Sequence, residues 1–344
     1  MAAAVDTSNT ELSKQYDTPM GLAHSTMQAL KDRIKLHYDL ASDYYLSLWG
    51  EHIHHGYWED GSETKEQAQV KLIQLLLQLS GVGENSNVLD VGCGIGGTSR
   101  YLASTLGCSV TGITISTKQV EIANRLTKAE AEKQASSAAA AAAAPASETS
   151  DKAKEIKADA DGFVPLGRGR IRFIELDAEK MGDFFAGQSA SFDAVWISEA
   201  LSHFPNKALF FENAFKVLKP GGKLALADWF KAENVTETEF ANDLKPIEDG
   251  MLLPPLCTQQ GYVDFAKGAG LSLLAGPKDI SKEVSRTWDI TWTLVQNPSL
   301  WAFAFSQGRD GIAFLQSFRA MRRGYANGTF RYAVISFEKP SGKA

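Results

Sequence analysis

Apolar residues recur along the chain with two periods, one typical of helices and one typical of short buried strands. Over residues 28–49 and 64–79 they return every three or four positions, which predicts two amphipathic helices. Strand and helix then alternate five times with short connections, which predicts an α/β fold with a doubly wound parallel sheet. The runs that predict its strands are largely apolar and lie at 88–91, 108–116, 170–177, 192–199 and 223–229; the second is rich in β-branched residues.

The rest of the chain is arranged around this sheet. Its first residues are small and polar, as is typical of a mobile tail, and its last part loses the regular alternation. The predicted organisation is a disordered tail at 1–25, an N-terminal helical lid at 26–62, the sheet domain at 63–235, and cap helices with closing strands of the same domain at 236–344.

One segment inside the sheet domain breaks the pattern. A block of alanines is followed by a stretch rich in Ser, Glu, Lys and Asp. Because alanine has a high helix propensity, residues 138–144 can extend the preceding helix, which Pro145 then ends. The remainder is too polar to pack against a core. We therefore expect residues 134–162 to form a disordered insert that is dispensable for chemistry.

The cap contains two further patterns. Residues 330–337 alternate apolar and polar, which predicts a closing antiparallel strand at the sheet edge. Trp288 and Trp292 lie four positions apart on a predicted helix. Burial statistics for tryptophan favour the core over a pocket wall for this pair.

The strand at 88–91 runs directly into a glycine-rich turn. Residues 88–98 read VLDVGCGIGGT, and a helical pattern begins at once. Glycines adopt positive φ and let a ligand lie against bare backbone at a helix N-terminus. An acid precedes these glycines and no lysine-plus-hydroxyl ending follows them, which suits a ligand with a cationic amine. The residues expected to bind that ligand here are Asp90, Gly92, Gly94 and Gly96.

Composition narrows the class of protein further. The apolar fraction of 44% is ordinary for a globular chain, and a net charge of −6 without a basic block argues against a nucleic-acid partner. Three cysteines without metal-ligand spacing favour a reduced compartment. The first residues lack the basic region and apolar core of a signal peptide, and no apolar run reaches membrane-spanning length. We expect a cytoplasmic protein without stable membrane insertion, with import into an organelle as an alternative, and leave its oligomeric state open.

A histidine-rich loop follows the first predicted helix. His52, His54 and His55 lie in the sequence HIHHGYWED at residues 52–60. Adjacent histidines point poorly at one ion, and no cysteine or carboxylate cluster elsewhere completes a ligand set. We therefore predict no metal site and interpret the loop as a lid or pocket wall.

Several of these segments resemble one enzyme family. Residues 88–97 match motif I of class I S-adenosylmethionine-dependent methyltransferases, hxDhGCGxGG, and LKPGG at 218–222 resembles their post-I signature. The order of pieces resembles gamma-tocopherol methyltransferases and, more distantly, sterol C-methyltransferases and cyclopropane fatty acid synthases. The resemblance implies a Rossmann-like sheet, S-adenosylmethionine as cofactor and a small-molecule acceptor. Further matching pieces lie at 38–45, 52–60, 112–119, 198–205, 279–288 and 320–340.

The resemblance also implies which residues bind the cofactor. Residues 112–119, GITISTKQ, are similar to a GxTxSxxQ variant in which Thr and Gln replace the usual acid at the ribose. Neutral hydrogen bonds suffice there, because ribose is uncharged. This implies ribose contacts for Thr114 and Gln119, although Thr114 also fits as a plain strand residue. Similar methyltransferases place an acid at the position of Asp177, next to Ala178, where it can accept from the adenine amine.

The candidate catalytic residues lie at the end of the fourth strand, just after it, and in the histidine-rich loop. A phenol, N-hydroxyl or amine acceptor must lose a proton, and a pocket histidine near its reference pKa of about 6.5 can take it. His203 is the first candidate, followed by His54 and His55, although a histidine that only shapes its loop is equally compatible. Glu199 matches a glutamate kept in sterol methyltransferases and is a candidate for catalysis and for cofactor binding.

One departure from the family bears on the substrate. Cyclopropane synthases and tocopherol methyltransferases have an acid directly before the histidine that corresponds to His203, whereas this chain has Ser202. The departure argues against cyclopropanation and against tocopherol itself. The chain resembles fungal secondary-metabolite enzymes, which implies methylation of oxygen or nitrogen on a small, largely apolar natural product such as an aromatic or indole alkaloid. Carbon methylation of a sterol, lipid or prenylated aromatic, and a catalytically inactive cofactor-binding regulator, remain alternatives.

Overall fold

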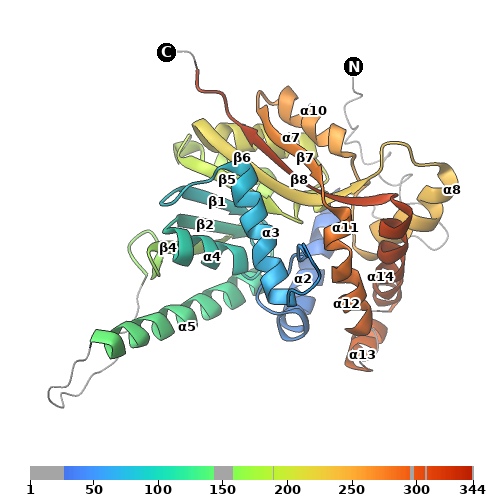
Figure 1. The fold of residues 1–344 in the computed structure, drawn as a ribbon, viewed down its shortest axis with the longest axis horizontal. Helices are drawn as coiled ribbons and strands as arrows, with labels where there is room; N and C mark the ends of the chain where they lie inside the picture. Colours follow the sequence, from blue (N-terminus) through green and yellow to red (C-terminus); the bar gives the residue numbers. More distant parts are fainter. Residues whose placement is uncertain (1–26, 143–157, 189, 295–297, 307, 343–344) are drawn as a thin grey trace.

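The centre of the protein is a single mixed sheet (Figure 1), seen in a computed structural model that describes residues 27–142, 158–188, 190–294, 298–306 and 308–342. Within these residues the strand order is β3-β4-β2-β1-β5-β6-β8-β7. The strands are β1 (Asn87–Val91), β2 (Ser109–Thr114), β3 (Val164–Leu166), β4 (Gly169–Glu175), β5 (Phe192–Ser198), β6 (Leu218–Lys231), β7 (Ser272–Asp279) and β8 (Phe330–Glu338).

The predicted parallel sheet is confirmed. Strands β4, β2, β1, β5 and β6 pair in parallel, and they correspond to the five strands expected from the sequence. Strand β8 is antiparallel to β6 as expected, but its predicted place at the edge is wrong, because β7 pairs with its other side. The side chains of β7 are largely exposed, and its sequence lacks the alternation of apolar and polar residues that predicts a strand. At the opposite edge, the short strand β3 also lacks such a pattern.

Helices cover both faces of the sheet, and alternate strand residues point to opposite layers. On one face, Leu72 and Leu102 of α3 and α4 pack with Val88 and Trp196. The helices are α2 (Met27–Trp49), α3 (Lys65–Ser80), α4 (Gly97–Leu106), α5 (Thr117–Ala142), η1 (Ala178–Lys180), α6 (Met181–Phe184), η2 (Ala186–Gln188), η3 (Leu201–His203), α7 (Lys207–Val217), α8 (Glu237–Glu239), η4 (Phe240–Leu244), α9 (Lys245–Gly250), α10 (Gln259–Gly268), α11 (Ser281–Val284), α12 (Arg286–Leu294), α13 (Pro298–Ser306) and α14 (Arg309–Asn327).

The expected disordered insert needs correction at both ends. Helix α5 continues to Ala142, because alanine favours the helix and Gln134 accepts a hydrogen bond from the Gly167 amide at 2.8 Å. At the other end, Asp159 closes a turn by accepting from the amides of Asp161 and Phe163, both at 2.9 Å. The part of the insert between these two ends, like the tail expected at 1–25, lies outside the described residues.

Helix α2 lies across the carboxyl ends of the strands. Lys31 forms an ion pair with Asp177, at 2.9 Å, and a second one with Glu179. Lys35 donates to the Ile115 carbonyl at 3.1 Å and pairs with Glu175. These contacts fasten α2 to the ends of β2 and β4, at the edge where ligands of doubly wound sheets bind. The function of α2 as a lid stays a prediction.

Candidate functional site

A cavity lies between the carboxyl ends of the strands, α2, the loop before α3 and the C-terminal helices. One part, which we name the glycine end, is formed by the turn after β1 and the ends of β2 and β4. The other part, the aromatic end, is formed mainly by rings from α2, β6, α12 and α14. The rings of the aromatic end include Tyr38, Tyr45, Trp229, Trp288, Phe314 and Phe318.

The glycine end is built on the turn that follows β1. Gly92 and Gly94 adopt φ values of 71° and 54°, and both line the cavity. A Cβ on Gly92 would lie 2.3 Å from the Ala200 Cβ, whereas one on Gly94 would meet only Ile53 at 3.8 Å. The backbone at Gly94 is therefore open to a ligand. Gly96 lies outside the cavity lining, and its missing Cβ makes room for the Phe173 ring, 2.4 Å from where a Cβ would stand.

Asp90 lies at the end of β1 with only 3% of its surface exposed. Its carboxylate accepts a hydrogen bond from Ser99, the residue at which the helical pattern begins in the sequence. Burial raises the pKa of Asp90 to about 7, and the Ser99 hydrogen bond offsets only part of that rise. A cationic ligand group beside it would favour the ionised form.

Thr114 and Gln119 are brought together as expected. The Thr114 hydroxyl donates to the Gln119 side-chain oxygen at 2.6 Å, and both residues are buried and line the cavity. Asp177 and Ala178 line the same wall beyond β4. Asp177 also caps η1 by accepting from the Glu179 amide at 3.0 Å, while Lys31 binds its other oxygen.

His203 follows β5 through a tight left-handed turn. Glu199 adopts φ 55°, which is uncommon for a residue with a side chain, and the buried Leu201 fixes the short helix η3. His203 Nε2 then lies 3.2 Å from the Tyr38 hydroxyl. Burial, together with the nearby positive charges of His37 and Lys207, lowers the pKa of His203 to about 3. The imidazole is therefore neutral near pH 7. The expectation that His203 titrates near pH 6.5 is wrong.

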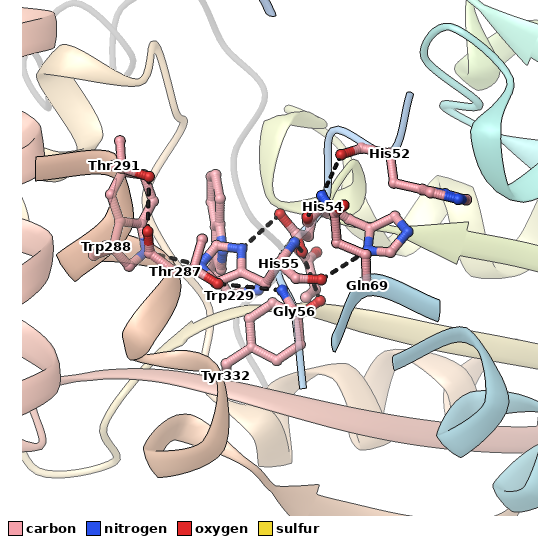
Figure 2. A network of polar contacts seen from close by, with 12 residues as sticks. His52, His54, His55, Gly56, Gln69, Trp229, Thr287, Trp288, Thr291 and Tyr332 are labelled. Atoms are coloured by element: carbon pink, nitrogen blue, oxygen red, sulfur yellow. Dashed lines mark hydrogen bonds and ion pairs between the residues drawn. The ribbon is translucent and has the colours of Figure 1, made fainter. Parts of the chain in front are cut away.

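His54 and His55 play different parts in the cavity wall (Figure 2). His54 donates from Nδ1 to the His55 carbonyl at 2.8 Å, and burial lowers its pKa. Its Nε2 has no partner among the described residues. His55 instead binds Glu199 twice, from its backbone amide at 2.7 Å and from Nδ1 at 2.9 Å. Tyr332 donates to the same carboxylate at 2.8 Å.

The loop that carries these histidines is fixed from several sides. Gly56 donates its amide to the Thr287 hydroxyl at 3.2 Å, and Gln69 of α3 donates to the His54 carbonyl at 3.1 Å. A Cβ on Gly56 would lie 2.6 Å from the Trp58 ring, so this position requires glycine. The loop is thus a rigid wall of the cavity.

The sequence interpretation missed most of the aromatic end. Trp288, expected in the core, is 6% exposed and lines the cavity as well as packing on Phe318. Tyr38 lies in a segment that matched the family, but nothing in its local pattern showed that it meets His203. The missed residues come from helices and a strand that are far apart in the sequence, and only the Trp288 and Trp292 stripe offered a signal.

Comparisons with known proteins agree with this geometry. The family model described as mycolic acid cyclopropane synthetase matches residues 24–152, and the one described as methyltransferase domain matches residues 89–226. The 27-O-demethylrifamycin SV methyltransferase of Amycolatopsis mediterranei is 32% identical over 251 residues, covering 73% of this chain and 77% of its own. The chain belongs to the class I S-adenosylmethionine-dependent methyltransferases.

Other relatives span almost the whole methyltransferase. The chloroplastic tocopherol O-methyltransferase of Arabidopsis thaliana is 28% identical over 341 residues, covering 92% of this chain and 85% of its own. A mycolic acid cyclopropane synthase complexed with SAH and CTAB superposes with a TM-score of 0.68 at 18% identity, covering 90% of this chain and 98% of its own. The cofactor of this methyltransferase is S-adenosylmethionine. Its glycine end fits that molecule, because Gly94 offers bare backbone beside a buried acid.

Two further features concern metals and membranes. Among the described residues, no group of three or more His, Cys, Asp or Glu side chains is placed to hold a metal ion. None of the described helices is long and apolar enough to cross a bilayer. The absence of a metal site in the mechanism stays a prediction.

Proposed function

We propose that this methyltransferase transfers a methyl group to oxygen or nitrogen of a small, largely apolar natural product, such as an aromatic or indole alkaloid. One observation carries the proposal. The glycine end and the aromatic end belong to the same cavity, and the polar groups of the aromatic end lie around His203. Aromatic rings favour a flat apolar acceptor. The few polar groups among them orient the atom that receives the methyl group.

The glycine end holds the cofactor in this proposal. Asp90 and the backbone at Gly92 and Gly94 bind its amino acid part, and Thr114 with Gln119 binds the ribose. Asp177 and Ala178 bind the adenine, with Lys31 closing over them. When bound, S-adenosylmethionine supplies a methyl group that its sulfonium already activates. The residues of the protein therefore have to align the acceptor rather than create a leaving group.

The aromatic end positions the acceptor. His203 and Tyr38 share a hydrogen bond at 3.2 Å, and both line the cavity, so a hydroxyl or amine of the acceptor can replace one of them as partner. Because His203 is neutral, it can accept a proton from that group. Its low pKa makes it a weak base, however, which favours nucleophiles that need little deprotonation, such as a neutral amine.

Carbon methylation of a sterol, lipid or prenylated aromatic is the second candidate. The same weak base supports it, since a carbon nucleophile with an electron-rich double bond needs no proton removed before the methyl group is transferred. The two candidates differ in the atom that carries the new methyl group.

The experiment is a labelled transfer with the whole protein. S-adenosylmethionine with a trideuterated methyl group is incubated with the enzyme and a metabolite extract, and mass spectrometry seeks a product about 17 Da heavier than its precursor. Asp90→Ala is the matched control. A label on oxygen or nitrogen supports the proposal, and a label on carbon selects the second candidate. An aliphatic product without any ring contradicts the interpretation of the aromatic end.

A further inference from the structure

His55 is enclosed by rings from four other elements. Ring centroids of Trp229, Trp288, Tyr325 and Tyr332 lie 5.8, 5.5, 6.3 and 5.1 Å from its own. Figure 2 shows His55 among Trp229, Trp288 and Tyr332. Only 2% of its surface is exposed. A polar ring buried this deeply needs partners at both nitrogens.

Trp288 supplies the partner at one of them. Its indole nitrogen lies 2.7 Å from His55 Nε2. An indole N–H can only donate, so Nε2 must accept, and the proton of the neutral ring must sit on Nδ1. Nδ1 in turn lies 2.9 Å from Glu199, to which it donates. Tyr325 lies farther from Nε2, at 3.4 Å.

This contact fixes the tautomer of His55. A proton on Nε2 would point at the indole N–H, and two donors would face each other 2.7 Å apart. Glu199 accepts hydrogen bonds from the His55 amide, from His55 Nδ1 and from the Tyr332 hydroxyl. These three hydrogen bonds favour the ionised form of the carboxyl group.

We propose that Trp288 is a positioning residue, whose indole N–H holds His55 in the Nδ1–H tautomer and so keeps the Nδ1–H group bonded to Glu199 on the wall of the transfer cavity. This inference rests on the proposed function of that cavity. A carboxylate held in place among apolar rings stabilises positive charge, such as that of the sulfonium or of an amine acceptor. Trp288 belongs to α12 of the cap, so the cap helps to orient the carboxylate at the end of β5.

Other titratable groups lie around His55. His54 precedes it and is neutral near pH 7, since burial lowers its pKa. Burial raises the pKa of Tyr325 and of Tyr332, which are therefore un-ionised. Burial also raises the pKa of Asp228 in β6 to about 7, so the charge of Asp228 changes near neutral pH and variants have to be compared at one pH.

The test is ¹⁵N NMR of the histidine-labelled full chain, with His55 assigned by the His55→Gln variant. In the wild type at about pH 8 we expect a neutral ring with its proton on Nδ1. In Trp288→Phe at the same pH, the share of the Nε2–H form should rise. Trp292→Phe, four residues along the same helix and outside the cavity lining, is the matched control and should leave His55 unchanged.

Cofactor binding supplies a second readout. By calorimetry at about pH 8, Trp288→Phe should bind S-adenosylmethionine up to about tenfold more weakly than the wild type, because Glu199 is no longer held in place. In a His55→Gln background, Trp288→Phe should cause no further loss. A wild-type His55 that carries its proton on Nε2 would overturn the inference even if Trp288→Phe does not fold. Both measurements are made without an acceptor. They can therefore succeed even if the proposed acceptor chemistry is wrong, and the two failures are distinguishable.

Discussion

At the scale of single residues, Asp90 couples its own ionisation to cofactor binding. Its pKa of about 7 means that the free protein carries a proton there at slightly acidic pH. The cationic amine of the cofactor favours the carboxylate, so binding must release that proton. We therefore expect the Kd for S-adenosylmethionine to rise about tenfold per pH unit below pH 7 and to level off above it. Calorimetry across this range measures the slope.

Two variants separate this coupling from general damage to the site. Asp90→Asn should bind more weakly and lose the slope, while keeping the fold. Thr114→Ala should weaken binding by roughly 1 kcal/mol, the loss of a neutral hydrogen bond, and should keep the slope. A pH-independent wild type would refute the role given to Asp90.

His203 gives a second prediction for a single side chain. His203→Ala should lower kcat by about a hundredfold if the acceptor must lose a proton. Because the pKa of His203 is about 3, the wild-type rate should show no loss due to this imidazole as the pH falls from 8 to 5. Steady-state kinetics with the acceptor identified by labelling checks both. His54→Ala is the control, and should mainly raise KM. Full kcat in His203→Ala would favour an acceptor that needs no base.

The limits of sequence interpretation are clearest at this scale. Asp90, Thr114 and Gln119 could be found because their roles depend on short local spacing around a strand end. Tyr38 and Trp288 could not, because their importance comes from contacts with His203 and His55, more than 160 and 230 positions away in the sequence. The lowered pKa of His203 could not be predicted from the sequence either, because its main cause is burial in the folded protein.

At the scale of elements, the ion pairs of Lys31 should hold α2 closed over the adenine side. Lys31, Asp177 and Glu179 are 14–20% exposed, so water screens these pairs less than surface ones. Lys31→Gln should speed hydrogen exchange in α2 about fivefold, equivalent to about 1 kcal/mol, and speed cofactor release. Exchange mass spectrometry and stopped-flow measure these rates.

Lys35→Gln is the matched control for the lid. Its pair with Glu175 is 33% and 45% exposed, so its loss should change both rates less. If Lys35→Gln loosens α2 as much as Lys31→Gln does, the lid is held by packing or by total charge rather than by the pairs at Asp177.

The alanine-rich insert gives the other prediction about an element. Residues 143–157 replaced by a short Gly/Ser linker should leave turnover near that of the wild type, because loop length changes closure entropy only slightly. This deletion keeps the hydrogen bond between Gln134 and the Gly167 amide and the turn that Asp159 closes. Deleting the whole insert expected from the sequence, residues 134–162, would remove both. Loss of methyl transfer in a folded deletion variant would show that the insert takes part in function.

The element scale also shows which structure the sequence predicts well. The five parallel strands were predictable because each is a buried apolar run between helices. Strand β7 was not, since Leu273 and Leu274 are 39% and 43% exposed and its pairing with β8 holds it in place. The order of β7 and β8 at the edge depends on contacts between segments, which no local pattern records.

At the scale of the whole molecule, the account divides one cavity between cofactor and acceptor. The division depends on the sheet, which brings the ends of β1, β2, β4 and β5 together, and on α2 and the cap, which add the aromatic rings. The sequence could predict the first part, because alternating strands and helices indicate a parallel sheet, in which the carboxyl ends of the strands meet at one edge. The second part brings α2, near the start of the chain, together with α12 and α14, near its end. It was seen only in the structure.

The most direct measurement is a crystal structure of the full chain with S-adenosylhomocysteine. We predict adenine beside Asp177 and Ala178, ribose at Thr114 and Gln119, the amino group near Asp90, and the sulfur facing the end of the cavity that holds Glu199 and His203. The rings of the aromatic end should remain free for an acceptor. Adenine bound among those rings, or sulfur facing away from Glu199 and His203, would contradict the account.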